Sequence, residues 1–186
     1  MKEADNILRI LQETLQAVRE NNAQRIIQLS DQTINTAAFT QDPDNIAVAV
    51  IVYSLGKIFE RERYKQFPQW KKFYSMLILH LEKSISDIEQ NKEEAFRKDF
   101  EDIREKINQL SGKLKKYIQE VFEKAKISKA SRIYEHGVSM EQTAKLLGIT
   151  IFELAEYAGQ TGISDVKESR TMDVKQRIKF AEEMFA

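Results

Sequence analysis

The sequence contains no cysteine and only two prolines, six glycines and two histidines among its 186 residues. Without cysteine, the chain cannot form disulfides, thiolate zinc sites or a cysteine nucleophile. Glycine and proline are the residues that most often interrupt helices, so their scarcity favours long helical segments. Four of the six glycines lie between residues 137 and 162, which concentrates the interruptions near the C-terminal end.

The chain also has no excess charge of either sign, because 29 lysines and arginines balance 29 aspartates and glutamates. A net charge of zero removes any global electrostatic attraction to nucleic acids or membrane surfaces. The longest nearly uncharged run, residues 45–56, is too short to span a bilayer, and residues 1–6 lack the apolar core of a signal peptide. We therefore expect a cytoplasmic protein with no membrane partner.

Apolar residues make up 42% of the chain and recur at intervals of three and four residues along most of it. This period predicts an all-α protein. Five amphipathic segments are expected before residue 126, at 4–18, 26–38, 43–59, 70–88 and, as one long fifth helix, 96–125. Asp42 followed by Pro43 marks the start of the third segment, which is the most apolar and should be the most buried.

The pattern changes after Ala125. Residues 127–162 predict three short helices, at 128–136, 139–147 and 151–158, which glycines separate. The polar stretch 164–170 has no period and indicates a linker, and Thr171 could begin a last amphipathic helix. The sequence thus predicts an N-terminal helical bundle (1–126) followed by a small helix-turn-helix-like module with a C-terminal amphipathic helix (127–186).

Residues 139–157 have the spacing of a helix-turn-helix. Ala144 is small enough to let a second helix cross closely, and Gly148, four residues later, can adopt the left-handed turn conformation. Leu154, six residues after the glycine, would fill the space between the two helices. No other segment of the chain has so specific a pattern.

The same stretch lacks the side chains with which DNA-reading helices contact bases. Such helices usually offer serine, glutamine, asparagine, arginine or lysine in their first turn, whereas this one begins Thr-Ile-Phe-Glu at 150–153. Residues 139–158 contain one basic side chain against three acidic ones, and DNA phosphates would repel that face. Flanking basic side chains could still contact a DNA backbone, although ordinary solvated helix faces are the simpler explanation for them. The candidate nucleic-acid contacts are Lys129, Arg132, Lys145, Thr150, Lys167 and Arg170.

Catalytic motifs are not evident. His80 lies beside the apolar stripe of its helix and His136 precedes Gly137 at a helix end, so both are expected to be structural. Neither histidine has an arginine at the spacing used by small helical RNases, and the sequence contains no His-Glu-x-x-His motif or glycine-rich phosphate loop. We expect no cofactor and no metal. An enzyme with a site among the bundle's carboxylates remains the third alternative.

The stretch 138–154, with its Leu-Leu-Gly-Ile sequence at 146–149, resembles the small helix-turn-helix antitoxins that pair with PIN-domain ribonuclease toxins. Residues 162–185 are similar to the partner-wrapping segment of such antitoxins. The resemblance implies a protein partner, with a PIN-like nuclease as one candidate, and DNA binding as a second property. The candidate partner-binding residues are Met172, Val174, Ile178 and Phe185, which could instead pack on their own module or mediate self-association.

These observations lead to two main hypotheses. The first is a non-enzymatic, antitoxin-like regulatory or adaptor protein that binds a protein partner, with DNA as a possible second ligand, through the helix-turn-helix-like C-terminal module. The second is a DNA-binding transcription regulator that uses the bundle for dimerisation or sensing. The salt dependence of any DNA binding distinguishes them, because a protein that binds DNA specifically loses affinity steeply as the salt concentration rises.

Overall fold

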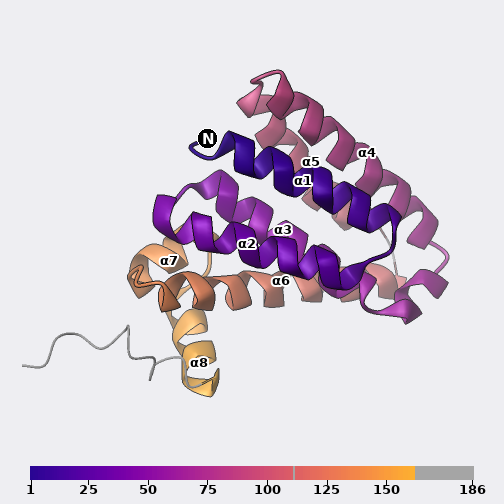
Figure 1. The fold of residues 1–186 in the computed structure, drawn as a ribbon. Helices are drawn as coiled ribbons and strands as arrows, with labels where there is room; N and C mark the ends of the chain where they lie inside the picture. The colour runs from indigo at the N-terminus through magenta and orange to yellow at the C-terminus, as the bar shows by residue number, and fades with distance from the viewer. Residues whose placement is uncertain (111, 162–186) are drawn as a thin grey trace, which may run out of the picture.

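The computed structural model describes residues 1–110 and 112–161, which form eight α-helices, one short 3-10 helix and no strand (Figure 1). The elements are α1 (Ala4–Arg19), α2 (Ala23–Thr40), α3 (Pro43–Phe59), η1 (Glu62–Gln66), α4 (Trp70–Glu89), α5 (Glu93–Gln109), α6 (Gly112–Glu135), α7 (Met140–Leu147) and α8 (Ile151–Thr161). The predicted all-α fold is confirmed. The linker and the last amphipathic helix that the sequence predicts lie outside the described residues.

The helices pack mainly against their neighbours in the sequence. α1 packs on α2, α2 on α3 and α4 on α5, while α1 also contacts α4 and α3 contacts α6. Figure 1 shows α4 and α5 together on one side of α1, with α6 running along the opposite side of the molecule and α7 and α8 near the C-terminal end of α6. Short connections between consecutive helices favour this arrangement.

α3 is the central helix, as its apolar sequence predicts. Its N-cap Asp42 accepts a hydrogen bond from the Asp44 N–H at 3.1 Å, and Pro43 occupies the first turn. Thirteen of its 17 residues are buried. α2 approaches it so closely at Gly56 that an added Cβ would lie 2.5 Å from a side-chain carbon of Ile27.

Two predicted helix boundaries are wrong. The long fifth helix expected over 96–125 is divided between α5, which ends at Gln109, and α6, which begins at Gly112. Gly112 has a φ of +69°, a conformation that glycine adopts without steric cost. The separate helix expected at 128–136 is instead the C-terminal part of α6, which continues unbroken to Glu135.

The apolar core consists of two clusters. The larger one lies within α1 to α6, while the second joins α2, α3 and α6 to the two C-terminal helices through Ile34, Val50, Ile133, Leu147 and Leu154. The boundary predicted near residue 126 falls inside α6, and residues on both sides of it belong to the second cluster. The bundle and the C-terminal helices therefore share a common core as well as a continuous helix.

Candidate functional site

The turn between α7 and α8 has the local geometry that its sequence predicts. Ser139 caps α7, since its Oγ accepts a hydrogen bond from the Gln142 N–H at 3.2 Å. α7 ends at Gly148, whose φ is +62°. The Ile149 N–H donates to the Ala144 carbonyl at 3.1 Å, and the Gly148 N–H donates to the carbonyl of Lys145. These two bonds form a Schellman motif, which requires the left-handed glycine.

α7 and α8 pack on each other at the end of α6. Ala144 and Leu154 are both buried, and α7 and α8 contact each other as well as α6. Because Ala144 carries only a methyl group, the second helix can pass close to the first. Leu154 then contributes to the second apolar cluster described above. The arrangement fixes α8 at the end of the molecule, where its first turn is accessible.

Thr150 and Glu153 form a reciprocal capping box at the start of α8. The backbone N–H and the hydroxyl of Thr150 donate to Glu153 Oε2 at 2.7 and 2.8 Å, and the Glu153 N–H donates to Thr150 Oγ1 at 3.1 Å. These hydrogen bonds from the Thr150 backbone and side chain lower the pKa of Glu153. The Thr150 hydroxyl is thus engaged within the chain, a role that the sequence interpretation as a nucleic-acid contact missed. The Thr-x-x-Glu spacing at 150–153 is the sequence pattern of a capping box and could have predicted this role.

The rest of the first turn of α8 is apolar and exposed. Phe152 is 85% exposed and Ile151 is 46% exposed. Single exposed apolar residues are common on protein surfaces, but two adjacent ones at the tip of a helix create a small patch with no polar side chain between them. In DNA readers this turn carries the polar groups that contact base edges. The chemistry of this turn therefore suits an apolar partner surface better than a DNA groove.

Lys129 does not belong to an exposed basic surface, contrary to the sequence prediction. The residue is only 1% exposed, and its Nζ lies 2.8 Å from Asp31 Oδ1 and 4.2 Å from the centroid of the Tyr53 ring. Burial lowers the pKa of Lys129, while the hydrogen bond to Asp31 acts in the opposite direction. Lys129 therefore joins α6 to α2 and α3 and is not available to bind phosphates.

Of the other predicted nucleic-acid contacts, the structure describes Arg132 and Lys145 in addition to Thr150. Arg132 is exposed at the end of α6 and pairs with Glu135 at 3.0 Å. Lys145 is exposed on α7. The remaining candidates, namely Lys167 and Arg170 for nucleic acid and Met172, Val174, Ile178 and Phe185 for a partner, lie outside the described residues.

Both histidines lie beside polar side chains of other helices. His136 Nε2 lies 3.1 Å from Asn35 Oδ1, and its ring lies 6.4 Å from that of the exposed Phe39. His80 is buried between α4 and α5, with its Nδ1 4.0 Å from Oδ1 of the fully buried Asp99.

Carboxylates also gather at this interface. Asp99 pairs with Lys83, and burial, followed by the hydrogen bond and charge of Asp99, raises the pKa of Asp87. In residues 1–110 and 112–161, no group of three or more histidine, aspartate or glutamate side chains is placed to hold a metal. We assign this polar cluster to the core between α4 and α5.

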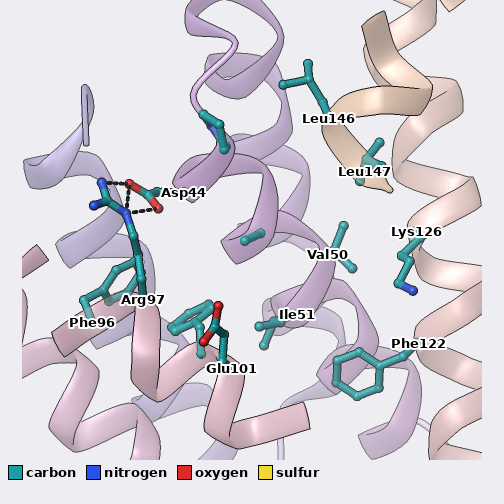
Figure 2. A pocket seen from close by; sticks show the side chains of 13 residues that line it. Asp44, Val50, Ile51, Phe96, Arg97, Glu101, Phe122, Lys126, Leu146 and Leu147 are labelled. Carbon is teal, nitrogen blue, oxygen red and sulfur yellow. Dashed lines mark hydrogen bonds and ion pairs between the residues drawn. The ribbon is translucent and has the colours of Figure 1, made fainter. Parts of the chain in front are cut away.

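A cleft of about 290 Å³ lies between α3, α5, α6 and α7. Figure 2 shows Arg97 paired with Asp44 on one side and Leu146 and Leu147 of α7 on the other. Arg97 Nε and Nη2 donate to the two oxygens of Asp44 at 2.9 and 2.8 Å, and this hydrogen-bonded pairing raises the pKa of Arg97. Glu101 and Lys126 also line the cleft, and its other lining residues are apolar.

Comparison with protein-family models, with curated proteins and with solved structures finds no match to this chain. The resemblance to the helix-turn-helix antitoxins therefore stays a prediction from short motifs. In the part of the chain that the structure describes, no helix combines the length and the apolar character needed to cross a bilayer.

Proposed function

We propose that this chain is a non-enzymatic regulatory or adaptor protein that binds a protein partner through a C-terminal helix-turn-helix-like module. The observation that carries the proposal is the exposed pair Ile151 and Phe152 in the first turn of α8. Burying a phenylalanine or isoleucine side chain against a partner stabilises a complex by about 1.5–3 kcal/mol. The sequence resemblance makes a PIN-like nuclease one candidate for this partner and favours an antitoxin-like role; self-association is the other candidate.

Three further features support a protein partner over DNA. The capping box commits Thr150 and Glu153 to each other, and Lys129 is buried in an ion pair. Glu153 adds a negative charge at the turn that would approach the phosphates. The capped helix start and the Schellman turn hold the apolar tip in a fixed place, which reduces the entropy lost on binding.

The test is copurification of the full-length tagged chain from its own host, followed by mass spectrometry, with Phe152→Ser compared with the wild type. Leu79→Ser is the matched control, because Leu79 is also an exposed apolar residue (60%) but lies on α4. We expect a specific protein to be recovered with the wild type and with Leu79→Ser, and to be lost or strongly reduced with Phe152→Ser. Equal recovery with all three chains would contradict the proposal.

The alternative function is a DNA-binding transcription regulator, and the spacing of α7, the Gly148 turn and α8 favours it. Fluorescence anisotropy with duplex fragments from the protein's own upstream region tests this alternative at about 50 and 200 mM salt. A reader that contacts several phosphates loses affinity by orders of magnitude over this interval. Sequence-selective binding below about 1 μM at physiological salt would favour the regulator.

A further inference from the structure

A second cleft, of about 410 Å³, lies between α3, α6 and α8. It shares no lining residue with the cleft in Figure 2. α3 contributes Tyr53 and Lys57, α6 contributes Lys124 and Ser128, and α8 contributes Tyr157. The volume falls within the range of about 300–1,000 Å³ typical of small-molecule sites.

The charges around this cleft are predominantly positive. Three cationic side chains line it, namely Lys57, Arg61 and Lys124, and no carboxylate occurs among its described lining residues. Two acids outside the lining, Glu60 and Glu120, accept hydrogen bonds from Lys57 at 3.0 Å and from Lys124 at 2.7 Å.

Arg61 donates to the neutral hydroxyl of Tyr64 at 2.6 Å, although the charge of Arg61 also acts on Glu120. Lys57 and Lys124 thus have carboxylate partners outside the lining, while the described lining itself carries three cations and no carboxylate.

The aromatic ring of Tyr53 lies under two ammonium groups. Lys129 Nζ is 4.2 Å and Lys57 Nζ is 5.8 Å from its centroid. Burial lowers the pKa of Lys129, the hydrogen bond and charge of Asp31 raise it, and the smaller effects of the Arg132 and Lys57 charges lower it. An anion placed beside Lys57 would relieve this repulsion between cations. Tyr53 and Lys57 both line the cleft, so an anion bound there would lie next to these cations.

We propose that this cleft binds a small anion that carries an aromatic ring, of the size of a nucleoside monophosphate. The three cations would contact the phosphate oxygens, for which lysine and arginine are the usual ligands. The tyrosines would pack against the ring, and the hydroxyl of Ser128 offers a donor and an acceptor to its polar edge. Since Tyr157 belongs to α8, the bound ligand would contact the bundle and α8 at the same time.

The proposal does not depend on the nature of the protein partner, and it is tested on the full-length chain by isothermal titration calorimetry. The probes are AMP, adenosine and inorganic phosphate, so that the ring and the anion are examined together and separately. We expect AMP to bind saturably and about ten-fold or more tightly than either fragment, because stacking and charge both contribute. AMP that releases no binding heat at millimolar concentration, or that binds no better than phosphate, would overturn the proposal.

A short single-stranded oligoadenylate distinguishes a free nucleotide from an RNA end, which carries the same chemistry. Binding of the oligonucleotide without binding of AMP would overturn the assignment of a small-molecule site. Saturation by AMP alone supports it. Each titration is repeated at two salt concentrations, since the phosphate contribution should weaken with added salt.

Two pairs of variants locate the site. Lys124→Gln should weaken AMP binding about five-fold, whereas Lys116→Gln, which removes the same charge from an exposed position elsewhere on α6, should leave it unchanged. Tyr157→Ala should weaken binding about ten-fold or more, whereas Tyr157→Phe retains the ring and most of the affinity. Equal losses in Lys124→Gln and Lys116→Gln would overturn the assignment. The comparison of the two lysine variants tests the location of the site even if Tyr157→Ala unfolds α8.

Discussion

The buried ion pair between Lys129 and Asp31 allows a quantitative test of how α6 is held to the rest of the molecule. Lys129 is almost fully buried, while the Asp31 side chain is 53% exposed. Removing one partner of a buried pair leaves an uncompensated charge and typically costs about 3–5 kcal/mol. Water can reach the site through the exposed Asp31 position, which reduces the expected cost. We therefore expect Asp31→Ala to lower the free energy of unfolding by about 1–2 kcal/mol.

Lys129→Met should behave differently, because methionine retains most of the buried aliphatic stem and removes the charge. Replacing a buried charge by an apolar side chain of similar volume is often neutral or stabilising. The loss of the cation–π contact with Tyr53 acts in the opposite direction by about 1–2 kcal/mol. We expect the Lys129→Met variant to lie within about 1 kcal/mol of the wild type, and the double variant with Asp31→Ala to be more stable than Asp31→Ala alone.

Urea unfolding followed by circular dichroism measures all four chains of this double-mutant cycle. Burial lowers the pKa of Lys129 below its value in the unfolded chain. Between those two pKa values the unfolded chain binds more protons than the native one, so stability should rise with pH in that alkaline window. This rise should be clear in Asp31→Ala and absent when Lys129→Met is added. Equal costs of Asp31→Ala in both backgrounds would refute the reasoning.

Three further predictions concern single positions. Gly56→Ala should destabilise the protein by about 1–3 kcal/mol, because the added Cβ would lie 2.5 Å from a side-chain carbon of α2. At Gly159 an added Cβ meets nothing within 4 Å, so Gly159→Ala should be neutral or stabilising. Thermal melting of the two variants compares these effects. Thr150→Ala should cost about 1 kcal/mol through loss of the α8 cap, and faster amide hydrogen exchange confined to α8 would demonstrate it. Burial raises the pKa of Asp87 above its value in the unfolded chain, so the free energy of unfolding should fall as pH rises between these two values. Asp87→Asn should abolish this pH dependence of the melting temperature. An unchanged pH dependence would contradict the raised pKa of Asp87.

The local features of this protein were determined by its sequence. Apolar residues at intervals of three and four specify each helix, and Asp42 with Pro43 starts α3. The Ser139 cap and the left-handed Gly148 specify the turn between α7 and α8. All of these depend on residues within about one or two helical turns of each other, and sequence patterns report such short separations directly.

The tertiary structure decided which of these helices and side chains meet. The apolar period runs through residues 96–125 without a break, whereas the structure divides them between α5, packed on α4, and α6, packed on α3. Lys129 meets Asp31 across 98 residues, so its sequence neighbours gave no sign that it would be buried. The cleft with Tyr157 likewise combines α3, α6 and α8. Such contacts depend on how whole helices pack, because a helix fixes which side chains share a face but not which helix covers that face.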